Sequence, residues 1–158
     1  MKTADLCDSY HRELRICEPI LTSFGGRRRF SGPITTVKVL EDNVLVRNAL
    51  ESVSEGSVLV VDGGGSKKCA LMGDRLGEIA VSRNLSGVII NGCIRDSAEL
   101  AKMDLGVLAL AAMPLKSKKE GKGEQNVTVE FGGVHWEPGH YVYADEDGIV
   151  ISPRKLAL

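Results

Sequence analysis

Apolar residues recur along the chain in two patterns, and each pattern predicts one kind of element. Short unbroken runs rich in Val and Ile indicate strands that are buried on both faces, whereas apolar residues three or four positions apart indicate helices. In the middle of the chain the two patterns alternate. Strands are predicted over 34–39, 58–61, 88–90 and 107–112, and helices from 42 or 43 to the turn at 55–57, over 74–85 and over 97–103. This alternation predicts an α/β domain.

The two ends of the chain follow other patterns. Thr3 is expected to cap a first helix, and the glycine-bounded segment 24–32 is expected to be a loop. The charged, glycine-punctuated segment 116–124 is predicted to be a mobile loop. Alternating apolar residues on both sides of the turn at 145–148 predict antiparallel strands in the last third. We therefore expect a single mixed α/β domain over residues 1–158, in which this β-rich tail packs against the alternating middle.

Composition and charge narrow the class of protein. A chain of 158 residues can form a core without disulfides or a structural metal. With 20 Lys and Arg against 21 Asp and Glu, and only 4% aromatic residues, it offers neither bulk attraction nor a stacking surface for nucleic acid. The four cysteines match no zinc or redox spacing, so buried thiols are expected. The N-terminus lacks a signal-peptide run and the apolar stretch 105–115 is too short to span a membrane, so we expect a cytoplasmic protein without membrane contact.

Two segments carry the residues best suited to chemistry. The segment Gly73-Asp74-Arg75-Leu76 precedes a predicted helix, and Asn91 to Asp96 follows a predicted buried strand. Ligands of alternating α/β folds collect at the carboxyl ends of strands, so both segments can face one crevice. The helix start offers unpaired N–H groups to a carboxylate or phosphate. Arg95 can hold an anion, and Asp96 can ligate a hard cation such as Mg²⁺.

Blander interpretations of the same residues stay open. An Arg-Asp pair often forms only a surface ion pair or a helix cap. The Gly63-Gly64-Gly65 run lacks the ending of a phosphate-binding loop and the spacing of a dinucleotide site, which favours a tight turn or close backbone packing. The basic runs at 27–29 and 116–122 lack interleaved aromatic residues and are typical of solvated loops.

The sequence as a whole resembles one known family. The resembling stretches are Leu6-Cys7-Asp8, Glu18-Pro19, Phe24-Gly25-Gly26, Val58 to Ser66, Asn91 to Asp96, Asn126 to Gly133, and Tyr143-Ala144-Asp145 followed by Gly148-Ile149. On these residues the chain is similar to the family named for regulator of ribonuclease E activity A, RraA, and to the related hydroxymethyl-oxoglutarate aldolases. Members with lyase activity carry an Asp, a spacer of twenty residues and an Arg-Asp pair, which match Asp74, Arg95 and Asp96 here.

This resemblance implies a fold, an assembly and a site. It implies a three-layer β/β/α swivelling-domain fold and a homotrimer with active sites at the subunit interfaces. It also implies a divalent metal, Mg²⁺ foremost or Mn²⁺, reached through Asp96. The substrate would be a small 2-oxo acid, bound by the amides of Gly73 to Leu76 and by Arg95, with Asp74 orienting the water that carries the proton.

The resemblance leaves the activity itself between two classes. As an enzyme, the protein would form a pyruvate enolate by cleaving 4-hydroxy-4-methyl-2-oxoglutarate or by decarboxylating oxaloacetate. Longer aldolase members supply a further acidic residue beyond the length of this chain, so decarboxylation is expected at least as strongly. The alternatives are a non-catalytic regulator that binds ribonuclease E and restrains RNA decay, and a trimer with an unknown substrate. The retained Asp96 favours an enzyme, and no methyl-donor site supports a menaquinone methyltransferase.

Overall fold

The computed structural model describes residues 2–157. Its helices are α1 (Thr3–Tyr10), α2 (Val44–Ser52), α3 (Asp74–Ser82) and α4 (Ser97–Leu100). Its strands are β1 (Arg15–Ile16), β2 (Thr22–Ser23), β3 (Phe30–Lys38), β4 (Val58–Asp62), β5 (Ala70–Met72), β6 (Gly87–Ile94), β7 (Gly106–Ala112), β8 (Glu124–Gln125), β9 (Val129–Phe131), β10 (Val134–Trp136), β11 (Tyr141–Asp145) and β12 (Gly148–Ser152).

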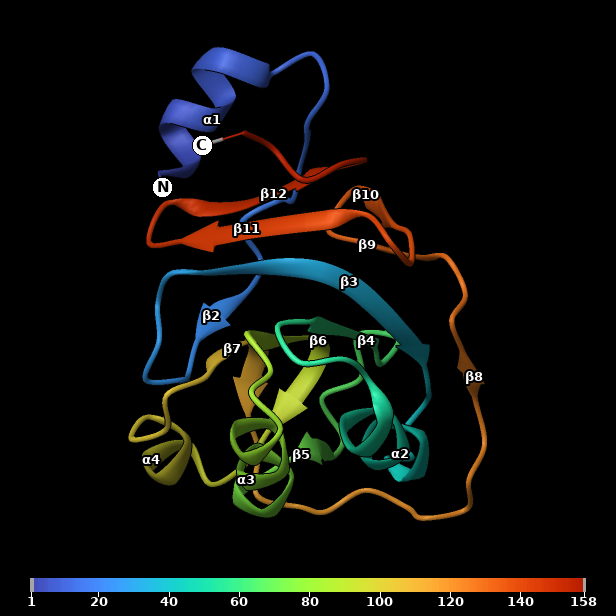
Figure 1. Ribbon diagram of the computed structural model, residues 1–158. Coiled ribbons are helices and arrows are strands. Elements are labelled where there is room, and N and C mark those ends of the chain that lie inside the picture. Colours follow the sequence, from blue (N-terminus) through green and yellow to red (C-terminus); the bar gives the residue numbers. More distant parts are fainter. Residues whose placement is uncertain (1, 158) are drawn as a thin grey trace.

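The strand β3 joins two β layers, because its two halves pair with different neighbours. Its first half pairs with β11 in antiparallel fashion, and its second half pairs with β4 in parallel. The sheet order is β1-β12-β11-β3-β4-β6-β7-β2. Figure 1 shows the β11 and β12 layer above β3, and the parallel strands with α2 and α3 below it. The expected three-layer β/β/α fold is confirmed, as are the antiparallel strands of the last third.

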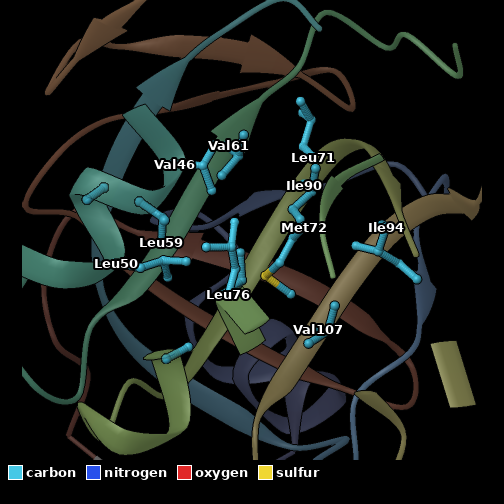
Figure 2. Close-up of a cluster of buried hydrophobic side chains, with 14 of the residues drawn as sticks. Val46, Leu50, Leu59, Val61, Leu71, Met72, Leu76, Ile90, Ile94 and Val107 are labelled. Atoms are coloured by element: carbon cyan, nitrogen blue, oxygen red, sulfur yellow. The ribbon is translucent and has the colours of Figure 1, made fainter. Parts of the chain in front are cut away.

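The buried strand β4 separates two hydrophobic cores. Its apolar side chains alternate between the cores, because successive residues of a strand point to opposite faces. Leu59 and Val61 pack with residues of α2 and α3, as the cluster in Figure 2 shows. Val58 and Val60 face the antiparallel layer, where Trp136 is fully buried. An unbroken apolar run is therefore correctly interpreted as a strand that is buried on both faces.

Several predicted boundaries are wrong: a tertiary contact explains the first of them and a local backbone conformation the second. Thr3 is the first helical residue and not the cap, because its N–H and hydroxyl both donate to the Asp145 carboxylate, each at 2.7 Å. The helix predicted over 74–85 ends at Ser82, where Asn84 adopts a left-handed conformation that stops it. The helix predicted over 97–103 ends at Leu100.

The strands are longer than their apolar runs, so two predicted loops shrink. The strand β6 extends to Ile94, and it therefore absorbs most of the segment that was predicted to follow it as a loop. The strand β3 begins at Phe30 and takes the end of the predicted loop 24–32. Paired backbone groups extend a strand beyond the apolar residues that reveal it.

The charged segment 116–124, predicted to be a mobile loop, is tied to the domain through its backbone. Lys118 donates its N–H to the Glu41 carbonyl at 2.9 Å and accepts from the Asn43 N–H at 3.3 Å. Farther along, β8 pairs with the end of β3. These bonds use main-chain groups only, so the charged composition of the segment does not reveal them. Within residues 2–157, no helix is long and apolar enough to cross a membrane.

Candidate functional site

A cleft of about 730 Å³ opens where β5 and β6 end and α2 and α3 begin. It brings together every residue proposed from the sequence, namely Gly73, Asp74, Arg75, Leu76, Arg95 and Asp96. The other residues that line it are Asn43, Val44, Arg47, Asn48, Ala70, Met72, Lys116, Ser117 and Lys119. The predicted crevice therefore exists, and two further parts of the chain, 43–48 and 116–119, contribute to it.

The short strand β5 places the two predicted segments side by side. It pairs in parallel with β6, and Met72 is the partner of Ile94. The Arg95 N–H also donates to the Met72 carbonyl at 2.9 Å. The two strands therefore end side by side, at the same edge of the sheet. The next residues along each strand are Gly73 and Arg95. This pairing explains why Gly73 and Arg95, which are 22 positions apart in the sequence, lie in one site.

The carboxylate of Asp96 is fixed against the start of α3. Its Oδ2 accepts the Asp74 N–H at 2.9 Å, a position where the helix dipole favours negative charge. Asp96 itself has φ 57°, and its own helix α4 receives no side-chain cap from it. Among the described residues Asp96 forms no ion pair, and its Oδ1 has no hydrogen-bond partner. Asp96 thus caps a neighbouring helix through one oxygen and keeps the other available in the cleft.

Gly73 gives the Asp96 carboxylate its room. A Cβ atom at residue 73 would lie 2.5 Å from Asp96 Oδ2 and 3.2 Å from the Cγ of Arg95. The backbone of Gly73 is extended, so the requirement is one of space and not of backbone conformation. Any larger residue would displace the two side chains that follow β6.

Some of the backbone N–H groups at the start of α3 already have hydrogen-bond partners, so fewer of the predicted amides are available to an anion. The Asp74 N–H is bound by Asp96, and the Gly77 N–H donates to the Gly73 carbonyl at 3.0 Å. Within residues 2–157, the N–H groups of Arg75 and Leu76 have no hydrogen-bond partner. A ligand carboxylate would therefore bind these two amides, at the positive end of the helix dipole.

Cations outnumber carboxylates around the cleft. Asp74 and Asp96 face five basic residues, namely Arg47, Arg75, Arg95, Lys116 and Lys119. Of these five, only Arg47 pairs with a carboxylate of the described chain, Glu51, at 3.3 Å. Arg95 is half-buried and makes one long contact, 3.4 Å, from Nη1 to the Pro114 carbonyl. A cleft of this charge attracts anions.

The oxygen donors of the cleft fit a hard cation that keeps most of its waters. No group of three or more His, Cys, Asp and Glu side chains is assembled within the described part of the chain. A preformed cage of the structural-zinc kind therefore does not match these residues. Mg²⁺ commonly binds one or two carboxylates and completes its shell with water and substrate oxygens. The Asp96 carboxylate, whose Oδ1 has no hydrogen-bond partner among the described residues, suits that mode of binding.

The contributions from 43–48 and 116–119 were missed from the sequence. Residues 116–119 were assigned to a solvated loop on their charge, yet Ser117 is buried and two lysines of the segment line the cleft. Long-range backbone pairing brings the segment to α2, and no local pattern reports such pairing. By contrast, the glycine run at 63–65 forms a close backbone packing site, as expected: a Cβ at Gly63 would lie 2.8 Å from the Asn91 carbonyl oxygen.

Comparison with known proteins gives matches over nearly the whole chain. The model of the RraA-like family, described as Aldolase/RraA, matches residues 3–151. A relative from Bacillus cereus named "Putative 4-hydroxy-4-methyl-2-oxoglutarate aldolase" is 54% identical, over 98% of this chain and 98% of its own length. A relative from Arabidopsis thaliana named "Putative 4-hydroxy-4-methyl-2-oxoglutarate aldolase 3" is 52% identical, over 99% and 97%.

Two solved structures have the same fold but different names. One, from Geobacillus kaustophilus, is called an S-adenosylmethionine:2-dimethylmenaquinone methyltransferase; it has a TM-score of 0.98 and 63% identity, over 99% of this chain and 97% of its own. The other, the RNA-processing inhibitor RraA from Thermus, has a TM-score of 0.96 and 45% identity, over 99% and 95%. Because three activities are named for one fold, function must be argued from the site.

Proposed function

The chain belongs to the RraA-like family, and from that premise we propose that it is a divalent-metal-dependent carbon–carbon lyase acting on small 2-oxo acids. The names of its aldolase relatives support a lyase at the level of the family. The finer assignment rests on the cleft. One observation carries it: Asp96 is held through Oδ2 on the start of α3, keeps Oδ1 available, and stands beside an arginine without a carboxylate partner in the described chain.

Different residues of the cleft bind different groups of the substrate and the cation. The amides of Arg75 and Leu76 bind the carboxylate next to the keto group. Arg95 lies beyond the paired ends of β5 and β6, where its guanidinium donates to the keto oxygen and stabilises the negative charge that develops there. Asp96 would hold the divalent cation, Mg²⁺ or Mn²⁺. When bound, this cation polarises the keto group as a Lewis acid.

Both candidate reactions break the bond beyond C3 and leave the electron pair on C3 as a pyruvate enolate. In oxaloacetate this cleavage releases CO₂. In 4-hydroxy-4-methyl-2-oxoglutarate the C4 hydroxyl must also lose its proton, so that C4 becomes the keto carbon of a second pyruvate. Asp74 orients the water that returns a proton to C3. Decarboxylation needs no base for a hydroxyl, and we therefore propose it alongside aldol cleavage.

A second candidate function is inhibition of RNA processing without catalysis. It is favoured by the similarity to the Thermus protein named as such an inhibitor. The formal net charge of -1 makes a protein partner, such as ribonuclease E, a better target than RNA itself. For both functions, the resemblance to the family leads us to propose a homotrimer in the cytoplasm.

Pyruvate release from oxaloacetate and from 4-hydroxy-4-methyl-2-oxoglutarate, with Mg²⁺ or with EDTA, tests the lyase. We expect metal-dependent turnover that falls at least ~10²-fold in both variants, because Arg95→Ala removes the cation that stabilises the developing negative charge and Asp96→Asn removes the charged ligand of the metal. Glu78→Gln is the matched control, since Glu78 is exposed on α3 and does not line the cleft. Turnover no higher than that of free Mg²⁺ would reject the lyase and direct the work to ribonuclease E binding.

A further inference from the structure

The cleft holds more positive charge than one carboxylate and one enolate oxygen require. Arg95 and the start of α3 already serve those two groups in the proposed reaction. Lys119 comes from a different part of the chain and lies at the start of α2, where its Nζ donates to Asn43 Oδ1 at 3.3 Å. No carboxylate within residues 2–157 pairs with Lys119. Its charge is therefore available to a ligand.

The side chain of Asn43 has a fixed orientation toward Lys119. Its Nδ2 donates to the Leu71 carbonyl at 3.2 Å, just before the end of β5. This bond determines which end of the amide is the oxygen, and Oδ1 is the end that meets Lys119. A neutral acceptor places the ammonium group without cancelling its charge, as a binding site for an anion requires.

The backbone that carries Lys119 is anchored by the buried carboxylate of Asp42, which is 2% exposed. Asp42 Oδ2 accepts the N–H groups of Glu120 at 2.9 Å and of Lys122 at 3.3 Å. Asp42 Oδ1 accepts the Val44 N–H at 3.1 Å, at the start of α2. One carboxylate thus ties the segment that bears Lys119 to the helix start that bears Asn43.

We propose that Lys119 binds the second carboxylate of a dicarboxylic 2-oxo acid, and that Asp42 is the residue that positions it. This inference rests on the proposed function and makes it narrower, because a monocarboxylic 2-oxo acid would leave Lys119 unpaired. The cleft volume of about 730 Å³ lies within the usual range for small-molecule sites, about 300–1,000 Å³. Lys119 is then a specificity-determining residue, whereas Asp42 acts only through it.

Two ligands that differ only in the second charge test the proposal. 2-Oxoglutarate and 2-oxopentanoate have the same chain length, but the latter ends in a methyl group. Their dissociation constants are measured by calorimetry with Mg²⁺ present, so the test does not depend on turnover. We expect 2-oxoglutarate to bind at least ~10-fold more tightly to the wild type, as one charge-assisted hydrogen bond implies.

Matched variants show whether Lys119 is the cause of this preference. Lys119→Gln should abolish it while leaving 2-oxopentanoate binding within about twofold, because uncharged Gln still fills the space. Lys118→Gln is the control, since Lys118 is an exposed neighbour that does not line the cleft. An equal affinity of the wild type for both ligands, or a preference that survives in Lys119→Gln, would overturn the proposal.

Asp42→Asn tests the positioning role, because Asn loses one of the two acceptor oxygens. We expect a smaller preference for 2-oxoglutarate and a higher KM for oxaloacetate, with a smaller change in kcat. If Asp42→Asn folds with its preference intact, Asp42 does not position Lys119; if it does not fold, Lys119→Gln still decides the binding role. The two proposals can fail separately. If the wild type prefers 2-oxoglutarate, Lys119→Gln loses that preference and the wild type shows no turnover, the lyase is rejected and the dicarboxylate site is retained. If the wild type turns over substrate but binds both ligands equally, the lyase is retained and the dicarboxylate site is rejected.

Discussion

Substituting Gly73 by Ala tests whether the position of the Asp96 carboxylate governs activity. The added Cβ would lie 2.5 Å from Asp96 Oδ2, whereas an ordinary contact begins at 3.4 Å, so the carboxylate must move by about 0.9 Å. The same displacement breaks the 2.9 Å bond to the Asp74 N–H. A misplacement of about 1 Å in a reacting group can cost ~10²-fold in rate. We therefore expect Gly73→Ala to lower kcat for oxaloacetate decarboxylation by ~10- to 100-fold.

The assay is metal-dependent pyruvate release, with the rate of free Mg²⁺ subtracted, together with a thermal unfolding curve. The backbone of Gly73 is extended, which Ala adopts readily, so the variant should stay folded and its unfolding midpoint should fall only by the effect of the lost Asp96 cap. A loss of rate in a folded variant would identify the position of the Asp96 and Arg95 side chains as the cause. If kcat of Gly73→Ala stays within twofold of the wild type, the geometry of Asp96 does not limit the reaction and our reasoning is wrong.

Two further predictions concern stability. Burial alone would raise the pKa of Asp145, but hydrogen bonds from the Thr3 hydroxyl and N–H and from the Asp147 N–H outweigh burial and lower the pKa. The stability that the ionised carboxylate contributes is complete above the unfolded pKa of about 3.9 and is lost as the pH falls from there through the lowered folded pKa. The urea midpoint of Asp145→Asn should therefore decline less steeply with acid than that of the wild type, and an equal slope would contradict this. Trp136 is fully buried, its ring centroid lies 4.7 Å from that of Phe131, and its Nε1–H donates to the Phe131 carbonyl. Trp136→Ala should therefore lower the free energy of unfolding by about 3–5 kcal/mol, measured by circular dichroism in urea. A loss below about 1 kcal/mol would contradict a role of Trp136 in the core.

Patterns in the sequence reveal elements that are buried by their own side chains. The run from Val58 to Val61 is apolar throughout, and the structure buries it between two cores, as predicted. The three-residue strand β5 escaped prediction, because it is too short to show a period. Thr3 shows the converse failure: its residue type favours a local cap, but a partner 142 positions away binds both its hydroxyl and its N–H. Sequence patterns report local burial well and distant pairing poorly.

The residues of the candidate site also fall into those that a local pattern reveals and those that only distant pairing brings in. Asp74, Arg95 and Asp96 could be singled out, because their residue types suit anion and metal binding and they adjoin predicted elements. Lys119 and Asn43 could not, since the bonds that bring them together lie between segments more than seventy positions apart. A chain whose local pattern is charged can still form the wall of a cleft when its backbone is anchored elsewhere. The residues proposed for chemistry were therefore easier to predict than the residue proposed for specificity.

Asp96 has a structural role at the start of α3 and a proposed role in the reaction, and one substitution can separate the two. A residue with φ 57° is best supplied by Gly, Asn or Asp, and the Asp96 carbonyl also accepts the N–H groups of Glu99 and Leu100. Asn would meet both demands, since it tolerates this conformation and its side-chain oxygen can still accept the Asp74 N–H. What Asn cannot supply is the negative charge at the second oxygen. If Asp96 served the fold alone, Asp96→Asn would be neutral, so its effect on turnover measures the part of Asp96 that acts on the reaction.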